Sequence, residues 1–190
     1  MAPIVQSTPE SEQDEPFLHR FPANPVLAGI VAGIVGYREN GRRLSGQVQI
    51  APLIVPLVIS FGEPFAIGLG SAPSAKDRWG SFAAGLFAGP VVIDSTGHAE
   101  CIQIDFTPLG AHRFFGLPMN ELSSRMVTLD DLGDCGILRL RQRLGEESNW
   151  NRRLNLAEDF VIDRLRRASP GHKSSLPVPR LPFGLRRQRE

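Results

Sequence analysis

Metal binding is the first chemistry to consider, because the chain contains four histidines and two cysteines. A metal held on β-strands needs side chains that converge from one strand face, usually two histidines one residue apart together with a carboxylate. The histidines are too scattered for that arrangement, at His19, His98, His112 and His172. His98 stands next but one to Glu100, and an exposed turn explains this pair better than a metal site does. The sequence therefore predicts no metal site and no cofactor.

Nucleophilic catalysis also lacks a matching motif. Ser81 lies in Gly80-Ser81-Phe82, which does not form the Gly-x-Ser-x-Gly elbow of hydrolases. Cys101 and Cys135 show neither CxxC spacing nor a motif with His and Asn, and we expect both to be small buried apolar side chains. The GLG turn at residues 68–70 is followed by a loop rather than a helix, so it does not indicate a phosphate-binding turn. We therefore expect no enzyme active site.

A polar face on one expected strand could instead bind a ligand. Side chains of the strand 99–106 alternate in character, with Cys101, Gln103 and Asp105 on one face and Ile102, Ile104 and Phe106 on the other. Alternation alone does not say which face is inside. We expect the face of Gln103 and Asp105 to be exposed to solvent. The alternative is a lumen in which these two groups orient a mostly apolar ligand.

If that lumen exists, its apolar lining would come from three aromatic side chains, at Phe61, Phe82 and Phe87. Large aromatic side chains are equally common in ordinary core packing, so their presence does not decide between the two readings. The ligand-binding residues predicted from the sequence are therefore Phe61, Phe82, Phe87, Gln103 and Asp105. The sequence does not identify the ligand.

Short β-rich runs separated by Gly and Pro carry these residues. They cover 46–51, 54–61, 65–70, 80–87, 90–95 and 99–106, and they are typical of an antiparallel sandwich or barrel. Apart from Pro56 and Ser60, the run 54–61 is apolar on both faces, so we expect a central strand there. Residues 71–78 are expected to form a surface loop.

Helices are expected on both sides of this β-region. Asn24 and Pro25 can start an amphipathic helix that continues to about Ile34, although Gly29 and Gly33 interrupt it and residues 34–37 could already be extended. After the strands, Thr107 and Pro108 can start a helix that Gly116 ends, and a short helix fits 119–125. Further helices are expected around 137–144, with Arg139, Arg141 and Arg143 outside, and over 150–167.

These elements predict an α+β fold in which an antiparallel β-sandwich or β-barrel is followed by a helical lobe. We divide the chain into a disordered arm at 1–16, a β-domain at 17–106, a helical lobe at 107–167 and a basic, Pro-rich disordered tail at 168–190. Arginines of that tail and of 164–167 could touch phosphates without reading a sequence, because no groove-reading helix accompanies them.

The composition sets limits on the partners. With 42% hydrophobic and 22% charged residues and a net charge of +1, the chain is typical of a globular protein without a global field that would attract nucleic acid or an anionic membrane. Its longest apolar stretches, 26–35 and 50–61, are too short and interrupted to cross a bilayer. The first sixteen residues contain four acidic and no basic residues, unlike a secretory signal, so we expect a cytoplasmic protein without membrane contact.

One long segment resembles a known family. Residues 106–122, FTPLGAHRFFGLPMNEL, and residues 127–133, VTLDDLG, are similar to the junction between the β-domain and the helical linker in one branch of the AraC-type bacterial transcription regulators. Upstream, GYRE at 36–39, LVISFG at 57–62 and GSFAAGL at 80–86 resemble the β-region of the same family. The resemblance covers roughly residues 17–167.

The resemblance implies a cupin-like β-barrel that senses a small effector or mediates dimerisation, connected by helices to helix-turn-helix units that bind DNA. Two such units need on the order of 100 further residues, and no positions after residue 167 match them. We therefore expect the effector-sensing or dimerising domain of a regulator, without its own helix-turn-helix. It would act on DNA indirectly, as a homodimer or as a heterodimer with intact regulators.

Two alternatives remain open at this stage. The first is a stand-alone small-molecule-binding barrel protein or barrel enzyme, which predicts a ligand or metal that stays bound during purification. The second is a purely structural dimerisation module, which predicts a dimer that small molecules do not affect.

Overall fold

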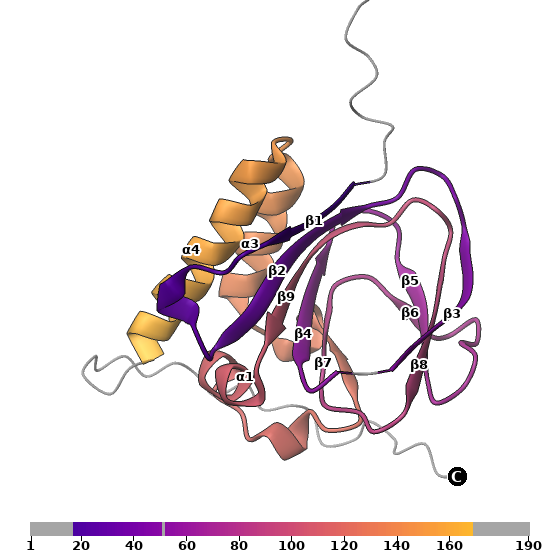
Figure 1. The fold of residues 1–190 in the computed structure, drawn as a ribbon, viewed down its shortest axis with the longest axis horizontal. Helices are drawn as coiled ribbons and strands as arrows, with labels where there is room; N and C mark the ends of the chain where they lie inside the picture. The colour runs from indigo at the N-terminus through magenta and orange to yellow at the C-terminus, as the bar shows by residue number, and fades with distance from the viewer. Residues whose placement is uncertain (1–16, 51, 169–190) are drawn as a thin grey trace, which may run out of the picture.

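The computed structural model describes residues 17–50 and 52–168 and shows an α+β fold with two antiparallel sheets (Figure 1). The larger sheet has six strands, in the order β1 (Phe17–Phe21), β2 (Val31–Arg38), β9 (Glu100–Phe106), β4 (Val55–Ser60), β7 (Phe82–Ala84) and β10 (Met126–Thr128). The smaller sheet has the order β3 (Leu44–Ile50), β8 (Pro90–Ser95), β5 (Phe65–Leu69) and β6 (Arg78–Trp79). All six expected β-runs are strands, and β4 is an inner strand as expected.

The two sheets pack face to face. Val58, Phe82 and Cys101 from the larger sheet meet Ile67 and Ile93 from the smaller one in a single apolar cluster. Among the described strands, no pairing joins one sheet to the other, so hydrogen bonding does not close them into a barrel. The observed architecture is therefore two antiparallel sheets with a shared apolar interior and helices on one side.

The region before β2 differs from the expectation of an amphipathic helix. The structure has one 3-10 turn, Pro25–Leu27, and then strand β2. Asn24 caps this turn, because its side chain accepts a hydrogen bond from the Val26 N–H. Gly29 then adopts a φ of +73°, which ends any helix, and the β-branched residues that follow favour an extended chain. The helix prediction was wrong at this point, and the extended alternative for 34–37 is confirmed.

The helices that follow β9 are α1 (Pro108–Phe115), α2 (Leu129–Leu132), α3 (Cys135–Glu146) and α4 (Trp150–Ala168). As expected, the Thr107 hydroxyl caps α1 by accepting from the Gly110 N–H, and Gly116 ends it with a left-handed φ of +68°. The expected short helix at 119–125 is instead a 3-10 turn, Met119–Glu121, and the sequence reading missed β10. β10 pairs with β7, so a segment assigned to the helical lobe completes the larger sheet.

Helices α3 and α4 lie on the side of the larger sheet that faces away from the smaller sheet (Figure 1). The apolar side chains on their inner faces belong to one core cluster with Ile102, Ile104 and Phe106 of β9, each 0% exposed. α1 approaches especially closely, because a Cβ at Gly110 would lie 2.0 Å from the backbone oxygen of Ile30. The sheet and the helices therefore share a core.

Two buried arginines of α4 connect the helices to the rest of the fold. Arg164 forms a 2.5 Å ion pair with Asp134, donates a 2.7 Å hydrogen bond to the Phe114 carbonyl and lies over the Phe114 ring. Arg153 forms a 2.5 Å ion pair with Glu100, the first residue of β9, and donates to carbonyls at the end of α3. Both arginines are less than 10% exposed. They satisfy buried carbonyls and hold α4 in place.

The first prediction concerns Arg164. Replacing it with Met should lower the free energy of unfolding by about 2–3 kcal/mol, because Asp134 and the Phe114 carbonyl lose a buried partner. The matched control is Arg166→Met on the same helix, where the side chain is 71% exposed and the cost should stay below about 1 kcal/mol. Urea denaturation followed by circular dichroism measures both. Equal losses in the two variants would contradict this role for Arg164.

Candidate functional site

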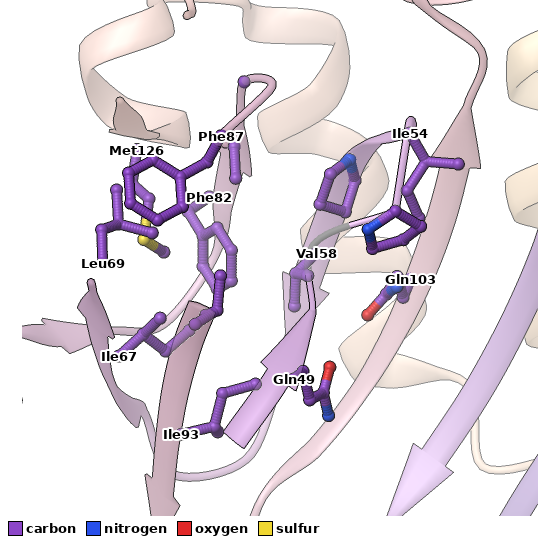
Figure 2. Close-up of a pocket in the computed structure, with 15 residues that line it drawn as sticks. Gln49, Ile54, Val58, Ile67, Leu69, Phe82, Phe87, Ile93, Gln103 and Met126 are labelled. Carbon is purple, nitrogen blue, oxygen red and sulfur yellow. The ribbon is translucent and has the colours of Figure 1, made fainter. Parts of the chain in front are cut away.

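A cavity of about 160 Å³ lies between the two sheets (Figure 2). Neighbouring residues on a strand point in opposite directions. Each strand that lines the cavity therefore contributes the side chains of only one of its two faces. Its walls are mostly apolar. The lining residues are Gln49, Pro52, Ile54, Pro56, Val58, Ile67, Leu69, Phe82, Ala84, Gly85, Phe87, Val91, Ile93, Gln103 and Met126.

Two glutamines provide the polar side chains of this wall, and none of the lining residues is charged. Gln103 projects from β9, and its Nε2 donates a 2.7 Å hydrogen bond to Oδ1 of Asp105 on the same strand face. Gln49 projects from β3 and is exposed. A mostly apolar cavity with a few placed polar groups is the usual form of a small-molecule site.

Asp105 stands directly behind Gln103 and is 4% exposed. Burial raises the pKa of its carboxyl, and this effect is opposed by the hydrogen bond from Gln103 and by the positive charge of Arg20. Arg20 lies 3.9 Å away, and its side chain is 69% exposed, so solvent weakens the attraction. The carboxyl is therefore held in place mainly by Gln103.

The structure brings four of the five predicted ligand residues together. Phe82, Phe87 and Gln103 line the cavity, and Asp105 is bonded to Gln103. The expectation that the face of Gln103 and Asp105 is exposed to solvent was wrong, because Gln103 lines the cavity between the sheets and Asp105 is buried. This arrangement corresponds to the alternative of an internal lumen.

Phe61 lies elsewhere. Its ring packs 6.0 Å from the Trp150 ring and 4.3 Å from the Arg153 guanidinium, on the side of the helices. Phe61 has the same parity as Leu57 and Ile59, whose side chains belong to the core shared with the helices, whereas Val58 faces the cavity. The structure therefore places Phe61 outside the predicted lumen.

Sequence reasoning missed most of the aliphatic wall. Ile67 and Leu69 on β5, and Val91 and Ile93 on β8, line the cavity from the smaller sheet. Their spacing of two residues is a signal that they share a face, but it does not reveal what that face contacts. Met126 was missed because it lies on β10, which was not predicted.

Other reactive groups have separate environments. Burial raises the pKa of Cys101 to about 12, and the charges of Glu39 and Glu100 add to this effect, so the thiol stays protonated. Cys135 is exposed at the start of α3, which corrects the expectation that both cysteines are buried. His98 is exposed, and Glu100 pairs with Arg153. Among residues 17–50 and 52–168, no three His, Cys, Asp or Glu side chains are grouped to hold a metal.

A second polar cluster connects the sheets. Glu39 accepts hydrogen bonds from the Tyr37 hydroxyl, the Ser95 hydroxyl and the Ala99 N–H, at 2.9, 2.5 and 2.8 Å. Burial raises the pKa of Tyr37, and the hydrogen bond to Glu39 adds to this. All three contacts join backbone or side chains of β2, β8 and the turn before β9, which indicates a structural role.

Comparisons of the chain with protein-family models, curated proteins and solved structures gave no match. In the part of the chain that the structure describes, no helix has the length and apolar character needed to cross a membrane.

The second prediction concerns the ionisation of Asp105. The pKa of Asp105 is raised in the folded state, so as the pH rises the unfolded state ionises first. The free energy of unfolding therefore falls until the pH exceeds the pKa of Asp105 in the folded state. Asp105→Asn carries no ionisable group. The free energy of unfolding of the variant, relative to the wild type, should therefore increase as the pH rises above the ordinary Asp pKa of about 4.

Urea denaturation at a series of pH values measures this difference. Asp130→Asn, at a side chain that is 71% exposed, controls for the same chemical change at the surface. If the difference in free energy of unfolding between Asp105→Asn and the wild type stays constant across the pH series, the ionisation of Asp105 does not destabilise the fold and the prediction is wrong.

Proposed function

We propose that the chain is the effector-sensing domain of an AraC-type transcription regulator, and that the effector is a small molecule bound between the two sheets. The observation that carries this proposal is the two-sided burial of β9. Gln103 faces the cavity, whereas Ile102 and Ile104 pack in the core shared with α3 and α4. A ligand that moves β9 would thus act directly on the packing of the helices.

The resemblance of residues 106–122 and 127–133 to the junction between β-domain and linker supports the same proposal. In this proposal the two packed sheets correspond to the cupin-like barrel of the family, and α1 to α4 to its helical linker. β9 runs directly into α1 through Thr107, and its first residue, Glu100, is paired with Arg153 of α4. Both ends of the strand therefore contact helices.

The volume of the cavity limits the size of the effector. An apolar protein cavity of about 150 Å³ binds a molecule the size of benzene, and this cavity measures about 160 Å³. We therefore expect the site to accept compounds with one small ring.

The third prediction tests binding in this cavity. Toluene, phenol, benzonitrile and benzoate serve as probes, and at least one of them should raise the melting temperature and shift methyl NMR signals of the cavity residues. Ala84→Leu places a larger side chain in the cavity wall and should abolish this effect. The matched control is Ala66→Leu on β5, since Ala66 is half-buried and is not part of the cavity wall.

No binding by any probe, or equal binding by Ala84→Leu and the wild type, would refute a ligand site between the sheets.

Dimerisation is the second part of the proposed function, and the exposed surface of β3 supports it. β3 has one neighbour, β8, and none of the other described strands pairs with its second edge. Val48, Ile50 and Leu53 are 65%, 90% and 82% exposed, and no charged residue occurs between Arg43 and Glu63. Natural proteins usually protect such an edge with charges. A second copy related by a twofold axis could cover it without bringing like charges together.

The fourth prediction follows from this surface. In sedimentation velocity, the wild type should be a dimer and Ile50→Lys a monomer, because a lysine at the edge strand disfavours apolar pairing. Leu18→Lys, at a 73% exposed position on edge strand β1, is the control and should remain a dimer. A monomeric wild type, or a dimer that Ile50→Lys does not affect, would contradict pairing through β3.

A further inference from the structure

The orientation of the Gln103 amide determines which hydrogen-bonding group the cavity offers. A side-chain amide has a donor end and an acceptor end. The Nε2 of Gln103 donates a 2.7 Å hydrogen bond to Oδ1 of Asp105, so the donor end faces Asp105, as an ionised carboxylate requires because it only accepts hydrogen bonds. Figure 2 shows Gln103 among the side chains that line the cavity. The carbonyl oxygen is therefore the end left for a ligand.

The remainder of the wall has few other side chains that could form a hydrogen bond with a ligand. Apart from Gln49, which is exposed, the other lining side chains are apolar. Pro52 and Pro56 lack backbone N–H groups, so they add no donors to their side of the cavity. A bound molecule would then meet the Gln103 acceptor and, apart from the exposed Gln49, an apolar surface.

The charge near the cavity further restricts the ligand. No cationic side chain lines it, and the buried Asp105 carboxyl stands behind Gln103. Arg20 pairs with Asp105 at 3.9 Å through a side chain that is mostly exposed. An anionic ligand would lose its hydration without gaining a positive partner, and this is unfavourable in an apolar site.

We propose that the cavity selects small uncharged ring compounds that carry one O–H or N–H donor, and that Gln103 recognises this donor through its carbonyl oxygen. This proposal rests on the sensing function proposed above and names its ligand class. Asp105 acts as a positioning residue, because it fixes the direction of the amide without facing the ligand itself. Phenol is the simplest probe of this class, and toluene is its counterpart without the donor.

The experiment compares association constants for phenol and toluene, measured by titration calorimetry or NMR. Gln103→Met keeps a side chain of similar length but removes the acceptor. The ratio of the phenol to the toluene constant should fall about tenfold in Gln103→Met relative to the wild type, as expected for one buried hydrogen bond. Gln47→Met on β3, where the side chain is exposed and outside the cavity wall, should leave the ratio unchanged.

Asp105→Asn tests the positioning role with a different readout. An asparagine can donate to the Gln103 oxygen as well as accept from its nitrogen, so the Gln103 amide is free to turn over. Benzonitrile accepts a hydrogen bond but cannot donate one, and its binding relative to phenol should therefore improve in Asp105→Asn. A purely structural role for Asp105 would weaken both probes by the same factor, and that result would overturn the assignment of Asp105.

The possible failures can be told apart. If toluene binds but the phenol-to-toluene ratio is unaffected by Gln103→Met, or if benzoate binds the wild type more tightly than phenol, the inferred ligand class is wrong while the ligand site itself stands. If none of the four probes binds, the sensing function and the ligand class both fail.

Discussion

The fold depends on burying the two faces of strand β9 in two different environments. Ile102, Ile104 and Phe106 are completely buried in the core shared with the helices, whereas on the opposite face Cys101 packs with residues of the smaller sheet and Asp105 is almost completely buried. A strand covered on both faces cannot shift by one residue without moving its polar side chains into the helical core. The register of β9 against β2 and β4 is therefore strongly fixed, and the positions of Gln103 and Glu100 are fixed with it.

Helix α4 reinforces this arrangement from outside the sheet. Arg153 contacts the start of β9 through Glu100, and Arg164 contacts α1 and the cap of α3 through Phe114 and Asp134. Buried ion pairs of this kind are geometrically demanding, because a displaced partner leaves an uncompensated charge. A displacement of β9 would thus alter the position of α4 through both the shared apolar packing and the Glu100–Arg153 ion pair. This double connection is the physical basis of the sensing function that we propose.

Much of the fold could be predicted from local sequence. The strand runs followed from turn residues and apolar runs, and Thr107, Pro108 and Gly116 defined the ends of α1 because capping is a local effect. The predictions failed where distant contacts decide. β10 has three residues and exists because it pairs with β7, and the cavity face of β9 depends on a sheet built from other segments. Alternation identified Gln103 and Asp105 as neighbours, but only the packing of the sheets shows that they are inside.

Hydrogen exchange followed residue by residue, with and without a saturating cavity ligand, tests most directly whether β9 couples the cavity to the helices. Phenol is the ligand, and Ala84→Leu provides the protein with a filled cavity. The account predicts that phenol changes amide exchange in α3 and α4 as well as in the cavity strands, and that the helical changes disappear in Ala84→Leu. Changes confined to the cavity strands would contradict coupling through β9.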